Sequence, residues 1–152
     1  MRINLTPQPF EPGALVTAFC AGREETGAVA TFVGLARAEK GAATALELEA
    51  YPGFTEAAIG EIAKEAVERF KLHDVQIVHR IGHIAPGEAI VFVATAAGHR
   101  REAFEACDFL MDYLKSRAPF WKKEHGPGGA RWIEPTDRDR TDAQRWDRGE
   151  TE

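Results

Sequence analysis

The chain has 152 residues, of which 44% are hydrophobic and 28% charged, as in an ordinary globular protein. Its 19 lysines and arginines stand against 24 aspartates and glutamates, which gives a net charge of −5. This balance argues against nonspecific binding to nucleic acid or to an anionic membrane, because both require a cationic surface.

The sequence shows no membrane-spanning segment, signal peptide or paired cysteine motif. No stretch approaches the roughly 20 apolar residues of a membrane span, and the first ten residues lack the apolar core of a signal peptide. Cys20 and Cys107 stand alone, without CxxC spacing, as expected of reduced thiols. We therefore expect a soluble, cytoplasmic protein.

The N-terminal third contains short strands and one short helix. Residues 2–5 alternate weakly in polarity, and residues 14–20 suit a helix. The β-rich run 26–33 and the alternating run 46–51 predict strands. A loop is predicted over residues 34–43, between these two strands.

Two longer helices and two strands follow. Apolar residues at helical spacing predict a helix that begins with Thr55 as its cap and ends at residue 70. Strands are predicted at 75–81 and 89–97. The second helix is expected over 100–117, where Pro119 prevents its continuation.

The C-terminal part is predicted to hold a hairpin and a polar tail. Its strands are expected at 120–123 and 131–133, around a glycine-rich loop at 125–130. The tail from residue 136 is rich in charge and poor in apolar residues, so we expect it to be mobile or only locally helical. Together these elements predict an α+β fold for residues 1–135, with a mixed or antiparallel sheet packed against helices, followed by a partly mobile tail at 136–152.

Four cations make the segment YLKSRAPFWKK, residues 113–123, the most informative part of the chain. Lys115, Arg117, Lys122 and Lys123 occur there without an acid, which gives a local charge of +4 and leaves −9 for the remainder. A cationic segment on an acidic protein favours a small anionic ligand or one docking peptide. The plain alternative is a solvated helix end followed by a basic strand.

Two further positions could bind an anion. His99 and Arg100 follow Gly98 where a predicted strand gives way to a helix, and free backbone N–H groups at a helix start attract anions. Arg37 lies in the predicted loop at 34–43. The alternative is a capping histidine with surface arginines.

A metal site and a nucleophilic cysteine are both poorly supported. His79 and His83 have the four-residue spacing of a helical zinc pair, but their segment predicts a strand, on which they would lie roughly 13 Å apart. Cys107 falls on the apolar stripe of a predicted helix and suits core packing. We expect no metal and no cofactor.

The run FEACDFLMDYLKSRAPFWKKE, residues 104–124, resembles the signature of the large, catalytic subunit of molybdopterin synthase. Further matches occur in the same order as in that family. They are TFVGLAR at 31–37, LELEAYPGFTEAA at 46–58, VHRIG at 78–82, PGEAIVFVATAAGHR at 86–100 and RWIE at 131–134.

The resemblance implies an α/β-hammerhead fold and a sulfurtransferase of molybdenum cofactor biosynthesis. Such an enzyme converts cyclic pyranopterin monophosphate (precursor Z) to molybdopterin by inserting two dithiolene sulfurs. The sulfur comes from a small ubiquitin-like subunit whose Gly-Gly end is a thiocarboxylate. Two large subunits would pair at the centre of a heterotetramer, and no catalytic cysteine is needed because the partner carries the sulfur.

The resemblance also implies roles for individual residues. Lys115 and Lys122 match the catalytic lysines, and Phe32 and Met111 match residues that line the pocket. The substrate-binding positions are Leu35, Ala36, Arg37, His99, Arg100, Lys123 and Glu124. Relatives often have a polar residue and then valine where this chain has Leu35 and Ala36, and Thr136 stands where a basic residue can occur.

Our hypothesis gives Lys115 the central role, in which it orients the thiocarboxylate and transfers protons, helped by a pKa that neighbouring cations lower. Lys122 would stabilise developing negative charge, while Arg37, His99 and Arg100 grip the phosphate. The alternative is a noncatalytic dimeric module that binds a ubiquitin-like or acidic peptide tail.

Overall fold

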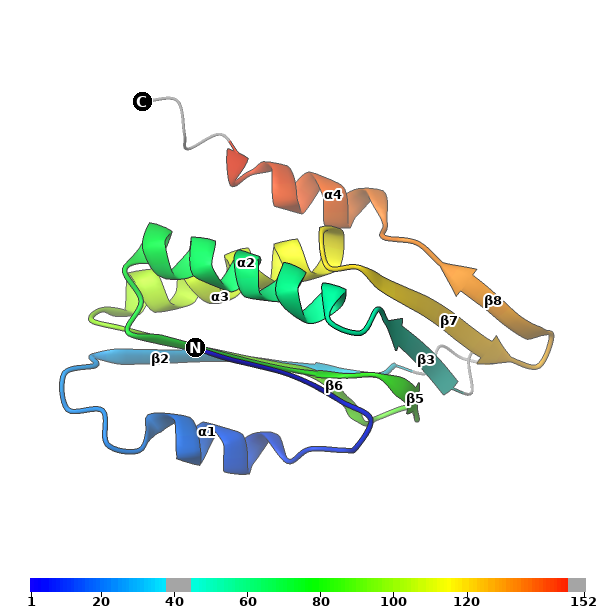
Figure 1. The fold of residues 1–152 in the computed structure, drawn as a ribbon, viewed down its shortest axis with the longest axis horizontal. Coiled ribbons are helices and arrows are strands. Elements are labelled where there is room, and N and C mark those ends of the chain that lie inside the picture. Colours follow the sequence, from blue (N-terminus) through cyan, green and yellow to red (C-terminus); the bar gives the residue numbers. More distant parts are fainter. Residues whose placement is uncertain (38–44, 148–152) are drawn as a thin grey trace.

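The computed structural model describes residues 1–37 and 45–147 of the chain. Helices and strands alternate irregularly along it (Figure 1). In chain order they are β1 (Arg2–Thr6), α1 (Pro12–Cys20), β2 (Ala28–Leu35), β3 (Ala45–Ala50), α2 (Phe54–Phe70), β4 (Asp74–Arg80), β5 (Gly82–Ile84), β6 (Ala89–Ala97), α3 (Arg100–Ser116), β7 (Phe120–Gly126), β8 (Gly129–Ile133) and α4 (Asp137–Gln144).

The main core lies on one face of a mixed four-stranded sheet, sheet A, of order β1-β4-β6-β2. Strand β1 is parallel to β4, and the other neighbours are antiparallel. Helices α2 and α3 cover one face of sheet A and α1 covers the other (Figure 1). Ile59 of α2 and Phe109 and Leu110 of α3 are fully buried in this core, and Phe19 of α1 fills the smaller core on the other face.

A second sheet, sheet B, extends from one end of this sandwich (Figure 1). Its order is β5-β3-β7-β8, and every pair is antiparallel. Ala36, Leu48 and Ile84 form a small core beneath it. Mixed and antiparallel sheets packed with helices confirm the predicted α+β class. No helix in the described part of the chain is long and apolar enough to cross a bilayer.

The cap predicted for α2 is wrong. Gly53 occupies the N-cap position with φ 78°, and Thr55 lies inside α2, where it is fully buried. Its Oγ1 accepts a hydrogen bond from the backbone N–H of Tyr51 (2.9 Å) and donates one to the carbonyl of Pro119 (3.0 Å). Thr55 therefore connects the start of α2 to the turn between α3 and β7.

The C-terminal hairpin is longer than the sequence predicts. Strand β7 continues to Gly126, β8 begins at Gly129, and only residues 127 and 128 form the turn. The φ of 103° at Gly129 is one that glycine adopts without strain. Strand β5, which the sequence did not predict, pairs with β3 through only three residues.

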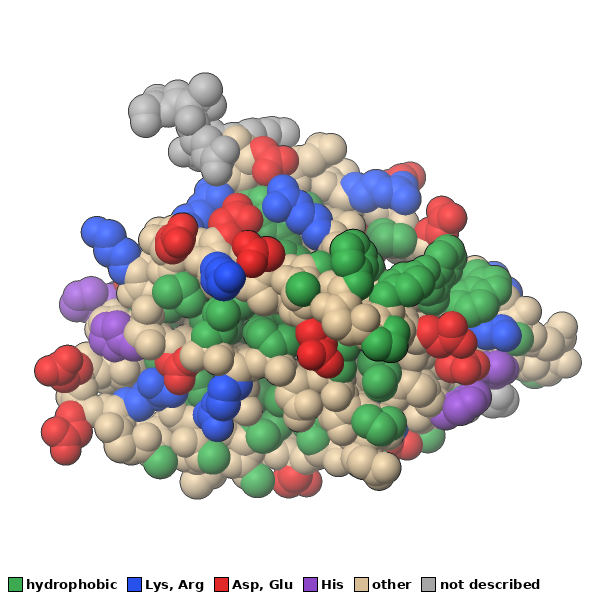
Figure 2. Space-filling model, in the orientation of Figure 1, with side chains coloured by type: hydrophobic (Ala, Val, Ile, Leu, Met, Phe, Trp, Pro, Cys, Tyr) green, Lys and Arg blue, Asp and Glu red, His purple; other side chains and the backbone are tan. Residues whose placement is uncertain are grey.

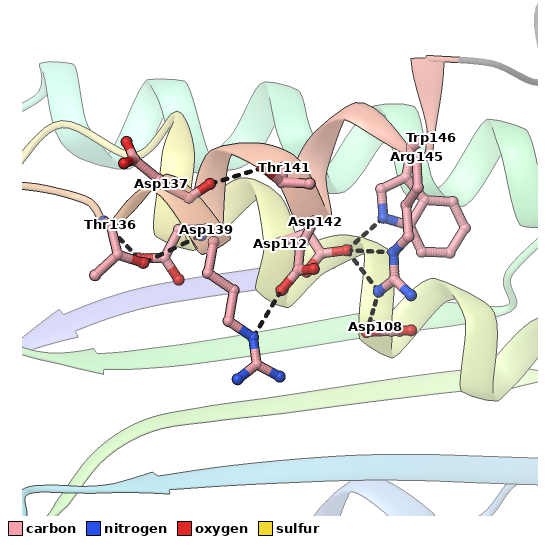
Figure 3. A network of polar contacts seen from close by, with 10 residues as sticks. Asp108, Asp112, Thr136, Asp137, Asp139, Thr141, Asp142, Arg145 and Trp146 are labelled. Carbon is pink, nitrogen blue, oxygen red and sulfur yellow. Dashed lines mark hydrogen bonds and ion pairs between the residues drawn. The ribbon is translucent and has the colours of Figure 1, made fainter.

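Part of the polar tail forms helix α4. Thr136 caps it with a capping box, in which Asp139 and Thr136 bond each other's backbone N–H groups. Helix α4 packs against α3. Arg145 lies between two acids of α3 (Figure 3), with its Nη2 atom 2.6 Å from Asp108 Oδ1 and 2.7 Å from Asp112 Oδ2.

Candidate active site

Lys115 and Lys122 converge because the chain reverses between them. Lys115 lies in the last turn of α3, where a cation interacts favourably with the helix dipole. Pro119 ends the helical path, and β7 returns with Lys122 directly opposite Leu48 of β3. The hydrogen bond from Thr55 to Pro119 fixes this turn at its centre.

The two lysines line both of two adjoining cavities. One cavity has a volume of about 200 Å³ and the other about 330 Å³. The residues common to both are Leu35, Leu46, Ile90, Lys115 and Lys122. A molecule in either cavity therefore meets the same pair of ammonium groups.

The smaller cavity is lined by apolar side chains and by the segment that joins β8 to α4. Phe32, Met111 and Phe120 line it, as the resemblance implied for the first two. Residues 133–136, which lead from the end of β8 into the tail, and Asp139 of α4 form another part of its wall. The ion pairs between α4 and α3 in Figure 3 thus hold one wall of the cavity in place.

The larger cavity is more polar. Ala36, Arg37 and Glu124 line it together with the two lysines. Ala36 itself is buried, and its backbone N–H bonds the carbonyl of Glu88 (2.8 Å), so the chain before Arg37 is fixed to the start of β6. A guanidinium and two ammonium groups around one cavity suit an anionic ligand.

The electrostatics of the site single out Lys122. Burial lowers the pKa of Lys122, and the positive charges of Lys115 and Arg37 lower it further, against the opposing charges of Glu124 and Asp139. Burial tends to raise the pKa of Asp139, but hydrogen bonds from Thr136 and the charges of the two lysines leave it below its ordinary value. Asp139 is thus an ionised acid beside two lysines.

His79 is a site residue that sequence analysis did not place there. It lines the smaller cavity, and its ring stacks on Phe120 with centroids 4.2 Å apart. Burial lowers the pKa of His79 to about 4, with the charges of Lys115 and Lys122 acting in the same direction against a backbone hydrogen bond. Its Nδ1 lies 2.8 Å from the carbonyl of Arg80. Since a carbonyl only accepts, Nδ1 carries the proton and Nε2 keeps a free lone pair at neutral pH.

Three of the residues that the resemblance implied lie elsewhere in this chain. His99 and Arg100 are exposed at the start of α3, so Arg100 lies about 22 Å along the helix from Lys115. Lys123 follows Lys122 on β7 and therefore points to the opposite face of sheet B. Its Nζ lies 5.1 Å from the ring centroid of Trp132.

The other implied residues do meet at the cavities. They are Phe32, Leu35, Ala36, Arg37, Met111, Lys115, Lys122 and Glu124. His79 and the tail residues that line the smaller cavity were not predicted from the sequence. The spacing of Thr136 and Asp139 is that of a capping box, and this signal could have placed the start of α4. No comparable signal marks His79, whose position in the cavity depends on the fold.

The fold and the site define an α+β protein with a pair of lysines between two cavities at the junction of two sheets, an arrangement that suits small anions. The family described as MoaE protein matches residues 5–117. The molybdopterin synthase catalytic subunit of Caulobacter vibrioides is 84% identical over 147 residues, covering 97% of this chain and 98% of that protein. The chain belongs to the MoaE family.

Solved structures agree with this assignment. The molybdopterin biosynthesis MoaE protein from Burkholderia ambifaria MC40-6 is 46% identical, with a TM-score of 0.83, over 96% of this chain and 97% of that one. A protein–protein complex of subunits 1 and 2 of molybdopterin-converting factor from Helicobacter pylori 26695 includes a chain of the same fold. That chain is 19% identical, with a TM-score of 0.73, over 90% of this chain and 91% of its own length. As a MoaE family member, this chain is an enzyme whose role is sulfur transfer in molybdenum cofactor biosynthesis.

Proposed function

We propose that the enzyme converts cyclic pyranopterin monophosphate to molybdopterin by inserting two dithiolene sulfurs. The sulfur donor is the thiocarboxylate at the Gly-Gly end of a small ubiquitin-like subunit. The observation that carries this proposal is the pair of lysines common to the two cavities. Both reactants are anions, and this arrangement lets them meet at the same ammonium groups.

Each cavity suits one of the reactants. The cavity with Arg37 suits the cyclic phosphate, because a guanidinium offers paired donors to phosphate oxygens. The smaller cavity, with Phe32 and Met111 in its lining, suits the Gly-Gly end, because two residues without side chains let the terminal thiocarboxylate approach the lysines. Lys115 and Lys122 then stand where the thiocarboxylate sulfur meets the pterin side chain.

Three side chains can serve the sulfur transfer. Lys115 orients the thiocarboxylate and exchanges protons as the sulfur forms a C–S bond to a side-chain carbon of the pterin and an oxygen leaves that carbon. Water then cleaves the thioester and releases the small subunit as a carboxylate, and a second thiocarboxylate delivers the second sulfur. Lys122 stabilises the negative charge that develops, and its lowered pKa brings proton exchange closer to neutral pH. Neutral His79 offers the Nε2 lone pair as a hydrogen-bond acceptor for a protonated lysine, so it orients an ammonium group without adding charge.

His99 and Arg100 act on the phosphate from a second copy of the chain in this proposal, because they lie far from the cavities of their own chain. An exposed aromatic patch supports assembly. Tyr51, Trp121 and Trp132 contact one another edge to face, with ring centroids 6.3 and 5.7 Å apart, on the sheet B side of the molecule. Figure 2 shows hydrophobic side chains gathered at this end, and such patches mark interaction surfaces.

The assembly that we propose is a central pair of these chains with one small subunit at each outer end. Relatives carry the name catalytic subunit, and the Helicobacter pylori protein was solved as a complex of two subunits. We propose the cytoplasm as the location of the reaction, because thiols such as Cys20 and Cys107 stay reduced there.

Reconstitution tests the proposal. The purified chain is mixed with thiocarboxylated small subunit and cyclic pyranopterin monophosphate, and dithiolene product is measured. Lys115→Ala should abolish product while the circular dichroism spectrum stays unchanged. Lys64→Ala is the matched control, because Lys64 is exposed on α2 and pairs only with Glu61 at 3.0 Å among the ion pairs of the described residues. Normal turnover by Lys115→Ala would refute the assignment, and a stable complex that yields no product with the unmodified chain would favour the noncatalytic module.

A further inference from the structure

The outer face of sheet B brings together a carboxylate and two imidazoles from three strands. Glu47 lies on β3, His83 on β5 and His125 on β7. Glu47 Oε2 is 2.8 Å from His125 Nε2, and Glu47 Oε1 is 3.8 Å from His83 Nε2. The three potential ligand atoms all lie within 4.8 Å of one another. Histidine and acidic side chains gather at this end of the molecule in Figure 2.

This face is separate from the active site. Side chains alternate across a strand, so Leu46, Leu48, Lys122 and Glu124 point to the cavities while Glu47 and His125 point away. His79, which has the spacing of a zinc pair with His83 in the sequence, lies on β4 buried against Phe120 and does not belong to this cluster. The partners of His83 come from strands about 40 residues away in either direction, which only the fold brings together.

The ligand chemistry and spacing suit a borderline divalent cation. Two imidazoles and one carboxylate form a ligand set that zinc accepts, with bond lengths of about 2.0–2.2 Å and a remaining position for water. Ligand atoms around such an ion stand about 3.0–3.5 Å apart. The two imidazoles lie 2.8 and 3.8 Å from the two oxygens of Glu47, close to this range, and the largest separation among the three ligand atoms, up to 4.8 Å, shortens when the exposed His83 side chain rotates toward the ion.

The backbone around the ligands is fixed, whereas one side chain is free to adjust. Pairing with β3 holds β5, and Nη2 of buried Arg80 donates to the carbonyl of His83 (2.9 Å). The His83 side chain is 71% exposed, so it can turn toward an ion without displacing a neighbour. Binding therefore orders the rotamer of His83.

The local charges also favour a cation. The pKa of the Glu47 carboxyl is lowered, chiefly by the hydrogen bond from His125, so the carboxylate is ionised at neutral pH. Lys123 of β7 stands directly opposite Glu47 of β3, and its positive charge opposes the binding of a cation. Its Nζ, however, lies over the ring of Trp132. Metal binding would replace the His125–Glu47 hydrogen bond and leave the His125 proton on Nδ1.

We propose that Glu47, His83 and His125 bind one divalent first-row transition-metal ion, for which Zn²⁺ is the probe. The ion connects β5 to β7 across β3 and stabilises the sheet whose other face carries Lys122. It takes no part in the sulfur-transfer chemistry. Water fills the remaining coordination positions, because the site is open to solvent.

Calorimetric titration of the untagged, chelator-treated chain with ZnCl₂ tests the site. One Zn²⁺ per chain is expected, and Zn²⁺ should raise the melting temperature. His83→Ala and His125→Ala should each weaken binding at least tenfold and remove that rise. His73→Ala is the matched control, since His73 is an exposed histidine of another surface, in contact with Thr26, and it should bind as the unmodified chain does.

Three outcomes would overturn the proposal. The first is no Zn²⁺ binding, and the second is binding that persists unchanged in His83→Ala, which would leave at most a two-ligand contact. The third is equal loss in the His73→Ala control. Because His83 is exposed, His83→Ala should fold normally, and an unchanged melting temperature without Zn²⁺ would show that lost binding does not come from unfolding.

Discussion

The pKa of buried His79 predicts that the protein loses about 2 kcal/mol of stability between pH 7.5 and pH 5 through this side chain alone. The folded protein holds the imidazole neutral down to a pKa of about 4, whereas the unfolded chain takes up a proton at about 6.5. Between these values the unfolded state binds more protons than the folded state. Stability is therefore complete above pH 6.5 and falls as the pH drops toward 4.

The magnitude follows from the two pKa values. One unit of difference corresponds to about 1.4 kcal/mol, so the full effect of His79 is about 3 kcal/mol, of which about 2 kcal/mol has been lost at pH 5. Asp74, whose pKa is about 2, contributes its own loss mainly below pH 4. Measurement at pH 5 therefore isolates the histidine from this half-buried acid.

Urea denaturation at pH 7.5 and pH 5 measures the effect, with His79→Asn as the perturbation. Asparagine keeps a donor near the carbonyl of Arg80 but cannot titrate. The unmodified chain should lose about 2 kcal/mol more than His79→Asn over this interval, while His73→Asn should behave as the unmodified chain does. Equal losses in the unmodified chain and His79→Asn would refute the reasoning, whatever the stability of the variant at pH 7.5.

Three further outcomes are expected. Thr55→Val removes a buried hydroxyl that bonds two backbone groups, and it should lower the free energy of unfolding in urea by about 1–3 kcal/mol. Thr55→Ser keeps the hydroxyl and should retain most of the stability of the unmodified chain. Thr136→Ala removes the cap of α4 and should cost about 1 kcal/mol locally, seen as faster amide exchange at Asp139; unchanged exchange would contradict the capping box. The rate of the unmodified enzyme should fall at alkaline pH, because Lys122 loses its proton below the ordinary pKa of lysine. Arginine stays protonated, so the fall in rate should vanish in Lys122→Arg. A fall that persists in Lys122→Arg would assign the pH dependence to another group.

The sequence predicted those elements whose evidence is local. The apolar stripe that ends at Phe70 and the break at Pro119 give the two long helices to within a few residues. Thr55 was misplaced because a threonine before an apolar run has the pattern of a cap, and only the fold shows that Gly53 turns the chain instead. Three residues of β5 are too few for any periodicity to appear.

The site could be predicted only in part, because its parts come from distant segments. The lysines of residues 113–123 share one continuous motif, and the convergence of Lys115 and Lys122 follows from the proline between them. His79 reaches the cavity through β4, and Asp139 reaches it through a helix that the polar composition of the tail conceals. The separation of Lys123 from Lys122 depends on which face of β7 points inward, and that register is set by pairing with β3.

The wall common to the two cavities has a consequence for the order of events in catalysis. An anion in one cavity neutralises the same ammonium groups that a second anion needs, so the two ligands should weaken each other's binding. Linkage requires the weakening to be equal in both directions. A small subunit that arrives with a thiocarboxylate would thus help to expel an anionic product, and a spent carboxylate tail would leave more readily once substrate has bound.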